Sequence, residues 1–293
     1  MPVRITVLVD NFVPRPGRLT GAYGLSLLVE KGDLRILYDT GATGEPLLRN
    51  AREMGVDLDR LDYIVLSHRH ADHTGGLMRL LEARRGSGPV LVAHPDLFEP
   101  ALVSDGSRWR DIGAPFTEGD LRDRGIRPLL IREPLKLDDG VWISGEVPRD
   151  RGPSHAGGMF RSRDGRMSAD DMMDDLALYL KVGDEVVAVT GCGHAGVENI
   201  VEHGERLVGG RLGALVGGLH LLHSEDRRIE EVAGYLSSKA PRLVVPLHCT
   251  GPRAHWQLSS RMGRAYRLSG AGSIIEYGEG DGRARTRRAD GSR

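Results

Sequence analysis

Cysteine is the scarcest reactive residue in this chain. Only Cys192 and Cys249 occur, and each stands close to a histidine. Two thiols cannot build the disulfide framework that holds small secreted domains together. The short apolar run at the N-terminus is not followed by a small-residue cleavage site, as it would be in a signal peptide. These absences predict a cytoplasmic protein.

The chain also lacks an excess of charge of either sign and any long apolar run. Lys plus Arg number 40 and Asp plus Glu number 41, so there is no basic field of the kind that binds nucleic acid or an anionic membrane. No apolar stretch approaches the roughly 20 residues that a membrane-spanning helix needs. We therefore expect a small-molecule substrate, with neither nucleic acid nor membrane as a partner, while an oligomer stays compatible with the sequence.

Short β-branched and leucine-rich runs alternate with helical stretches. The pattern predicts strands over residues 3–9, 24–30, 34–38, 63–67, 90–93, 129–133, 141–144, 176–182, 185–189, 214–216, 243–247 and 273–277. It predicts helices over residues 47–54, 73–84, 197–208, 225–238 and 253–262. Strands followed by helices in each half indicate an α/β (α+β) chain whose two similar halves pack face to face.

We expect one domain over residues 1–278 and a frayed tail over residues 279–293. Residues 103–175 are rich in Gly, Pro, Arg and Asp and predict an irregular insertion that forms part of a pocket wall. Six aspartates lie in the stretch 148–175 together with five arginines, Arg149, Arg151, Arg161, Arg163 and Arg166. Two interpretations stay open: arginines that bind phosphate, or a solvated loop in which the aspartates neutralise them.

The strongest signal is the segment 67–76, which reads Ser-His-Arg-His-Ala-Asp-His-Thr-Gly-Gly after an apolar strand. Alternate side chains at a strand end face the same way, so His68 and His70 point together. Asp72 and His73 follow where the chain turns into a helix and reach the same pocket. Three imidazoles and a carboxylate suit zinc, or iron and manganese. The alternative interpretation is a polar loop that happens to contain histidines.

This H-x-H-x-D-H pattern resembles the signature of the metallo-β-lactamase superfamily. The turn at Asp39 and the late strand that ends at His248 resemble further motifs of the family, so the likeness covers nearly the whole chain. The phrases around Cys192, His220 and His248 resemble the branch named for 7,8-dihydropterin-6-methyl-4-(β-D-ribofuranosyl)aminobenzene-5'-phosphate synthase. The resemblance implies a four-layer αββα sandwich with a two-metal site, most simply zinc, at one edge.

Carried over to this sequence, the family pattern makes His68 and His70 ligands of a first metal ion. Asp72 and His73 would bind a second metal ion, and His248 would complete that second site. Asp39 would lie behind the ligands and accept a ring N–H from one of the histidines.

The sequence departs from the family pattern in its middle. Cys192 stands where most members have a bridging aspartate, and the region of an earlier histidine ligand contains Glu146 but no histidine. His194 is the predicted replacement. Cys192 is either a ligand or plain core, and Glu146 is a lesser candidate to reach a metal or orient a ligand. His220 is left open between a ligand, a substrate contact and a structural histidine.

A two-metal site lowers the pKa of a bound water, and Asp72 would orient that water or accept its proton. We expect a hydrolase that uses a metal-bound hydroxide on a small phosphorylated or cyclic-phosphate metabolite. His223, Arg149 and Arg151 are candidate substrate contacts. Lactone or thioester hydrolysis, iron-dependent redox chemistry and a metal-stabilised ligand-binding protein are the alternatives.

Overall fold

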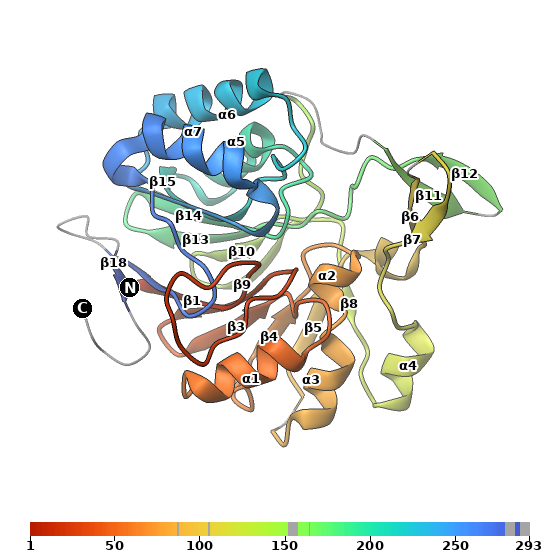
Figure 1. The fold of residues 1–293 in the computed structure, drawn as a ribbon. Coiled ribbons are helices and arrows are strands. Elements are labelled where there is room, and N and C mark those ends of the chain that lie inside the picture. Colours follow the sequence, from red (N-terminus) through yellow and green to blue (C-terminus); the bar gives the residue numbers. More distant parts are fainter. Residues whose placement is uncertain (87, 105, 152–157, 164, 279–284, 288–293) are drawn as a thin grey trace.

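The computed structural model describes residues 1–86, 88–104, 106–151, 158–163, 165–278 and 285–287. Two β-sheets pack face to face, and helices cover their outer faces, so the body of the molecule has four layers (Figure 1). The predicted α/β class and the αββα sandwich are confirmed.

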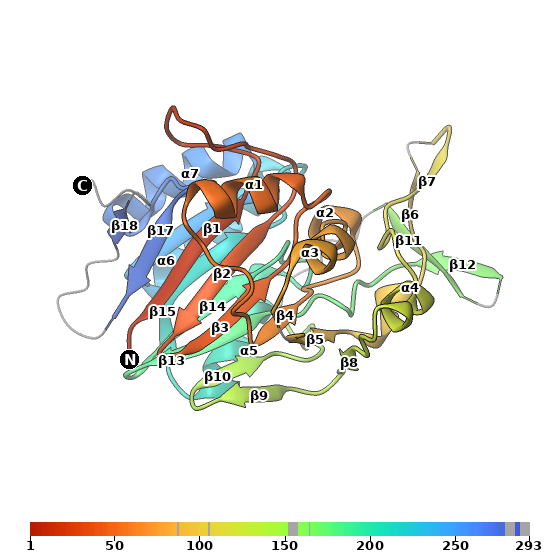
Figure 2. The ribbon, with the colours of Figure 1, turned by 90° about the horizontal axis from the view of Figure 1, so that it is seen from below.

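The first sheet is built mainly from the N-terminal half. Among the described residues its strands are, in spatial order, β18 (Arg285–Arg287), β17 (Ile274–Tyr277), β1 (Val3–Val9), β2 (Ser26–Lys31), β3 (Leu34–Tyr38), β4 (Tyr63–Val65), β5 (Val90–Ala93) and β8 (Leu129–Leu130). Strands β3, β4, β5 and β8 run parallel, whereas β1 is antiparallel to both neighbours. Helices α1 (Glu45–Glu53) and α3 (Leu77–Ala83) pack on the outer face through leucines, and the short α2 (Ala71–Thr74) precedes α3 (Figure 2).

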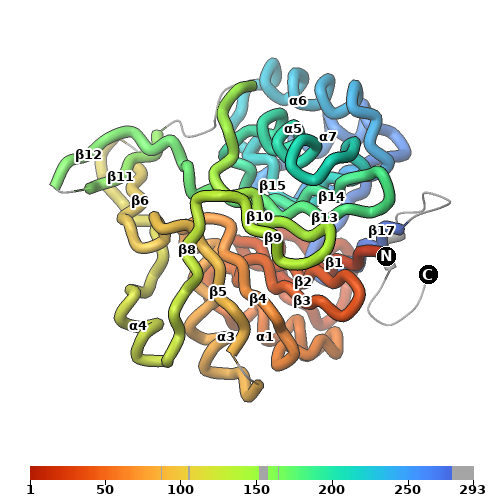
Figure 3. Tube along the Cα trace, turned by 180° about the vertical axis from the view of Figure 1, so that it is seen from behind, coloured from red at the N-terminus to blue at the C-terminus, as the bar shows by residue number. Residues whose placement is uncertain are grey.

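The second sheet belongs to the C-terminal half. Among the described residues its strands are, in spatial order, β16 (Leu243–Leu247), β15 (Arg211–Gly218), β14 (Glu185–Thr190), β13 (Leu178–Val182), β10 (Val141–Ile143) and β9 (Leu135–Asp138). Helices α5 (Val197–Val208), α6 (Asp226–Lys239) and α7 (Pro252–Met262) cover its outer face (Figure 3). No helix in the described part of the chain is long and apolar enough to cross a bilayer.

A continuous apolar core joins the two sheets. Val3, Ile5 and Val7 point inward from β1 and pack in the same cluster as Val187 and Val189 of β14. Most positions of the central strands are apolar because both faces of these strands are covered, one by the opposite sheet and one by helices. The core holds the two halves in a fixed relation, and that relation positions the strand ends at the edge of the sandwich.

Residues 103–175 are not an irregular insertion, and that part of the prediction is wrong. They include β8, β9 and β10, which join the main sheets, and helix α4 (Glu118–Asp123). A third sheet projects from the sandwich (Figure 1), and its described strands are β12 (Arg166–Ala169), β11 (Met159–Arg163), β6 (Ala101–Ser104) and β7 (Trp109–Asp111). Strands β7 and β12 are exposed throughout, so they lack the apolar alternation that predicts a strand.

The predicted helix over residues 73–84 is two helices, separated at Gly75 and Gly76. A Cβ atom on Gly75 would lie 2.1 Å from Ala42 O, and one on Gly76 would lie 2.1 Å from Thr40 O. The two glycines therefore allow the chain to pass directly against the turn that follows β3. This contact brings the end of α2 close to the Asp39 turn, where Thr40 Oγ1 donates to His73 O at 3.0 Å.

The prediction that the chain is frayed after residue 278 is also wrong in part. Arg285–Arg287 form β18, which pairs with β17 in antiparallel register. The first sheet therefore continues into the predicted tail. The remaining tail positions, 279–284 and 288–293, lie outside the described residues.

Candidate metal centre

The predicted ligands meet at one edge of the sandwich, where strands of both sheets end. Each of five strands is followed within three residues by a side chain of this centre: Asp39 after β3, His68 after β4, Cys192 after β14, His220 after β15 and His248 after β16. The first two come from the first sheet and the other three from the second. The centre is therefore assembled by the packing of the two halves.

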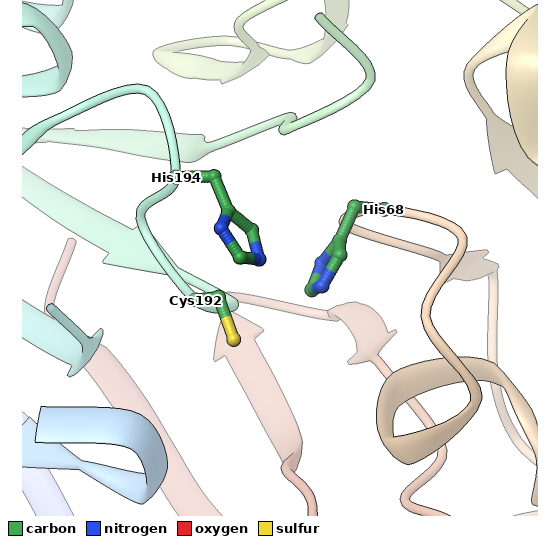
Figure 4. Close-up of side chains that lie close together, drawn as sticks. All are labelled: His68, Cys192 and His194. Atoms are coloured by element: carbon green, nitrogen blue, oxygen red, sulfur yellow. The ribbon is translucent and has the colours of Figure 1, made fainter. Parts of the chain in front are cut away.

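One group of donors surrounds His68. His68 Nε2 lies 3.1 Å from His70 Nδ1, and the ring of His194 lies 4.8 Å from that of His68 and 5.1 Å from that of His70, centroid to centroid. His68, Cys192 and His194 point toward one another (Figure 4), and their ligand atoms all lie within 4.8 Å. The structure thus brings His194 to the two histidines that the sequence placed together.

A second group adjoins the first and centres on His73 and His248. The two Nε2 atoms are 3.2 Å apart. Asp72 Oδ2 lies 3.1 Å from His248 Nε2 and 3.7 Å from His73 Nε2. Cys192 Sγ is 3.2 Å from His73 Nε2. Cys192 therefore lies between the two groups and contributes its sulfur to both.

Asp39 fixes the orientation of two of these rings. Its Oδ2 atom lies 2.6 Å from His73 Nδ1 and accepts the hydroxyl proton of Ser67 at 2.7 Å. Because a carboxylate only accepts, His73 Nδ1 carries a proton. The Ser67 hydroxyl already donates its hydrogen bond to Asp39, so Ser67 Oγ accepts a hydrogen bond from His68 Nδ1 at 2.9 Å. In the neutral form of each ring, Nε2 then presents a lone pair to the cluster.

His248 is fixed in the same way from the first sheet. Asn11 Nδ2 donates to His248 O, and Gly24 N donates to Asn11 Oδ1, which sets the orientation of the Asn11 amide. Asn11 Oδ1 therefore accepts from His248 Nδ1 at 3.0 Å. Asp10 Oδ1 accepts from His248 N at 2.8 Å. Sequence analysis missed Asn11 and Asp10, although they follow β1 as Asp39 follows β3.

These hydrogen bonds leave lone pairs facing each other. With Nδ1 of His73 and of His248 committed to acceptors, their Nε2 atoms meet at 3.2 Å beside the carboxylate of Asp72. Two lone pairs at this separation repel each other unless a proton or a cation lies between them. Imidazole nitrogens, a carboxylate oxygen and a thiol sulfur are together a suitable donor set for zinc. The residues present therefore fit a divalent metal ion.

Burial and neighbouring charges set the protonation of the donors. Burial lowers the pKa of His70 to about 4, which keeps this ring neutral, as a ligand must be. Burial also opposes charge on His73, but Asp39 and Asp72 outweigh it and raise the pKa of His73 to about 9. A cation that binds His73 therefore has to displace a proton from it.

Three backbone positions of the centre are strained. Asp39 has φ 62°, and His220 and His248 both have φ 49°, in the left-handed region that non-glycine residues rarely adopt. Such conformations persist only where surrounding contacts hold them and are frequent at functional sites. The ring of His220 lies 4.1 Å from that of His194, centroid to centroid, so His220 borders the cluster.

Glu146 is not brought to the ring cluster. Its Oε1 atom lies 3.0 Å from His94 Nε2, and it forms an ion pair with Arg132. The prediction that Glu146 binds a metal or orients a metal ligand is therefore wrong, because its carboxylate contacts His94 and Arg132 instead.

The predicted substrate contacts have different surroundings. Arg149 Nη2 donates to Met172 O, and its Nε and Nη1 are buried without a hydrogen-bond partner in the described structure. Arg151 is exposed, and its Nε lies 3.3 Å from Glu202 Oε2. His223 is exposed. Arg149 alone of the three keeps buried donors available.

Sequence analysis missed a buried ion cluster behind the histidines. Arg69 points away from its neighbours in sequence, with its side chain 1% exposed, and pairs with Asp170 and Asp174. Asp174 Oδ2 also accepts from Arg69 N at 2.9 Å. Next in the chain, Asp175 Oδ2 accepts from Ala195 N at 2.8 Å. The segment 170–175 thus holds the His68 loop and the His194 loop together.

Comparison with known proteins decides the family. The sequence model of the metallo-beta-lactamase superfamily matches residues 19–167. This chain belongs to that superfamily. A relative from Methanocaldococcus jannaschii, described as an uncharacterised protein, is 33% identical over 256 residues, which cover 87% of this chain and 93% of the relative. The predicted superfamily is confirmed, and its members are enzymes that generally bind divalent metal ions.

Further comparisons agree with the predicted branch. The 7,8-dihydropterin-6-methyl-4-(β-D-ribofuranosyl)-aminobenzene-5'-phosphate synthase of Methanocaldococcus jannaschii is 26% identical over 290 residues, 94% of this chain and 97% of that protein. The crystal structure of Tm1679, described as a metal-dependent hydrolase of the beta-lactamase superfamily, matches with a TM-score of 0.81 and 28% identity. It covers 94% of this chain and 100% of Tm1679.

Proposed function

We propose that this member of the metallo-beta-lactamase superfamily is a metal-dependent hydrolase with a centre for two divalent metal ions, for which zinc suits the donors best. One observation supports this proposal above all: His73 Nε2 and His248 Nε2 face each other at 3.2 Å. The two lone pairs repel each other unless a proton or a cation lies between them. The first ion is assigned to His68, His70 and His194. The second is assigned to Asp72, His73 and His248, with Cys192 between the two.

Two divalent ions held in this way supply a water of lowered pKa and a Lewis acid for a substrate oxygen. Asp72 is the donor that reaches solvent, since its side chain is 18% exposed whereas those of His73 and His248 are fully buried. Substrate therefore approaches from the side of Asp72. We assign to this carboxylate the roles of orienting the attacking water and accepting its proton. Tyr23, an exposed side chain whose ring lies 5.1 Å from the ring of His248, adjoins this second group of donors.

We propose a small phosphorylated metabolite as substrate. The name of the synthase from Methanocaldococcus jannaschii includes a 5'-phosphate, and that protein aligns with 94% of this chain. Arg149 offers two buried donors, Nε and Nη1, for an anionic group. The other arginines of the segment are less suited, because Arg161 and Arg163 pair with Asp96. The proposal of Arg149 as an anion contact replaces the broader expectation for this segment.

Bond formation is the second candidate activity, because the same relative is named a synthase and not a hydrolase. A hydrolase consumes water and releases an alcohol or acid from a single substrate. A synthase requires two organic substrates. Assays with and without a second substrate separate the two activities.

The first experiment is elemental analysis of the purified protein and of the double variant His68→Ala/His70→Ala. We expect at least two metal ions per chain, with at least one lost in the double variant. His255→Ala is the matched control, since His255 lies on α7 and its Nδ1 contacts the Tyr266 hydroxyl. An intact protein that neither contains nor takes up any divalent metal would refute the proposal.

Turnover is tested next on phosphomonoesters, phosphodiesters, cyclic phosphates, lactones and thioesters, with the metal identified by the analysis. Asp72→Asn should abolish turnover, because the variant side chain no longer accepts a proton from water. A variant that keeps full turnover would show that Asp72 has no part in the reaction. Loss of turnover with unchanged substrate binding separates a catalyst from a metal-stabilised binding protein.

A further inference from the structure

The only two cysteines of the chain meet beside the metal centre. They are 57 positions apart, yet Cys249 Sγ donates to Cys192 O at 3.4 Å. Strand β15 lies between the strands that precede them, β14 and β16. A Cβ atom on Gly218 of β15 would lie 2.7 Å from Cys249 Sγ and 3.1 Å from Cys192 Cα. The side chains therefore approach each other over Gly218, a strand position that has no side chain of its own.

His220 completes this group. The sulfur atoms of Cys192 and Cys249 and a ring nitrogen of His220 all lie within 4.8 Å of one another. His220 N also donates to Cys249 Sγ at 3.3 Å. The backbone at His220 is left-handed, φ 49°, a conformation that non-glycine residues rarely adopt. The strained residue thus directs its amide and its ring toward the same thiol pair.

We propose that Cys192, Cys249 and His220 form a further metal site, of soft character, that shares the Cys192 sulfur with the two-metal centre and takes a thiophilic cation such as zinc, cadmium or copper(I). Two sulfurs and one imidazole favour such cations over magnesium, calcium or manganese. Cys192 and Cys249 are 3% and 4% exposed, so a bound cation is shielded from water. The amide hydrogen bond from His220 to Cys249 persists when the sulfur is charged and stabilises it.

Binding at this site releases the proton of Cys249, and also that of Cys192 if the two-metal centre has not already displaced it, as the sulfur–metal bonds form. The bond from Cys249 Sγ to Cys192 O is then lost, because the sulfur no longer carries the proton that it donates. The competing interpretation is a pair of neutral buried thiols that only fill space. The two interpretations differ in one measurable property, which is whether Cys249 binds metal.

Cobalt(II) is the probe, added alone to reduced, metal-free full-length protein. Sulfur bound to cobalt gives a charge-transfer absorption in the near ultraviolet, and this chain has no cysteines besides these two. We expect about three cobalt ions per chain, with the last one increasing the sulfur band. Cys249→Ser should lose that last ion and about half of the sulfur band. The half of the band that remains in Cys249→Ser comes from Cys192, and adding Cys192→Ser should remove most of it.

Thiol titration in denaturant, before each experiment, verifies that both sulfurs are reduced. Thr250→Ser is the matched control on the same 3-10 turn, His248–Thr250, and should titrate as the unaltered chain does. Cys249→Ala, together with melting curves of all variants, separates lost binding from lost folding. A folded Cys249→Ser or Cys249→Ala protein that binds as much cobalt with an undiminished band would overturn the soft site.

Failure of the soft site is distinguishable from failure of the two-metal hydrolase. In His68→Ala/His70→Ala the cobalt bound by the histidines is reduced, whereas the band that depends on Cys249 should remain. If the two-metal proposal is wrong but the soft site is right, the double substitution changes nothing and Cys249→Ser still removes sulfur absorption. If only the soft site is wrong, the histidine variant loses metal and the Cys249 variants do not.

Discussion

Asp39 Oδ2 lies 2.6 Å from His73 Nδ1, and the same oxygen accepts the hydroxyl proton of Ser67. Through Ser67 this carboxylate also determines which nitrogen of His68 is protonated. His68 and His73 are assigned to different metal ions in the proposed centre. A single buried side chain thus prepares one ligand of each site, and the two sites should respond together to its loss.

Asp39→Asn tests this dependence. The variant amide accepts only through its oxygen, so its NH2 group must face either Ser67 N, which donates to Asp39 Oδ1 at 2.7 Å, or the Ser67 hydroxyl and His73 Nδ1, which share Oδ2. We expect metal affinity to fall by about 10- to 100-fold, the usual effect of removing a group that orients a histidine ligand. Competition with a chelator measures the change. Asp33→Asn, at an exposed turn, is the control and should bind metal normally. Equal affinity in both variants would contradict the role of Asp39.

His194 and Glu146 were alternatives for the same missing ligand, and substitution separates them. His194→Ala should retain about one metal ion fewer than the unaltered chain, because its ring adjoins those of His68 and His70. Glu146→Gln should retain the full number, since its carboxylate contacts His94 and Arg132 instead. Elemental analysis after dialysis gives the result. The opposite pattern would restore Glu146 as the ligand.

Arg69→Met should destabilise the fold strongly. The substitution leaves Asp170 and Asp174 buried without their cation, a loss that typically costs about 3–5 kcal/mol. Urea denaturation of the metal-free protein measures the free energy of unfolding without a contribution from bound metal. Arg122→Ala is the control, because its ion pair with Glu118 is exposed and such pairs contribute about 0–1 kcal/mol. Similar losses in both variants would refute the structural importance of the buried cluster.

Gly191→Ala should weaken metal retention without altering any ligand. The added Cβ atom would lie 2.1 Å from Ser67 Oγ and 2.6 Å from Ser67 Cβ, so the serine has to leave its bond to Asp39. Overpacking of this kind costs about 1–3 kcal/mol. Melting temperature and metal content are the measurements. Gly88→Ala, whose Cβ would meet nothing within 4 Å, should match the unaltered protein in both.

The sandwich could be predicted because its central strands are apolar on both faces and end in glycine or polar residues. The predicted ranges 34–38, 90–93, 243–247 and 197–208 coincide with β3, β5, β16 and α5. The projecting sheet could not be predicted, because β7 and β12 are exposed along their whole length. The alternation of apolar and polar residues indicates which positions of a strand are buried. Strands β7 and β12 form backbone pairs without burying either face, so their sequences carry no such alternation.

The candidate ligands were accessible to sequence analysis because several follow a single strand and therefore lie within six positions of one another. The residues that orient them were not. Asn11 is 237 positions from His248, and Asp174 is 105 positions from Arg69. Neither asparagine nor aspartate has a pattern that reveals such a partner. The position of Cys249 likewise depends on Gly218, a residue of another strand.

Because residues from both sheets form the metal centre, mutations far from the centre can affect it. His68 and Cys192 approach each other only while the intervening apolar core keeps the halves in register. The affinity for metal therefore depends on how the two sheets are positioned relative to each other. A substitution in the middle of the core that shifts one sheet by a fraction of an ångström should release metal while the chain is still folded. Metal loss would thus precede unfolding as the earliest sign of damage anywhere between the sheets.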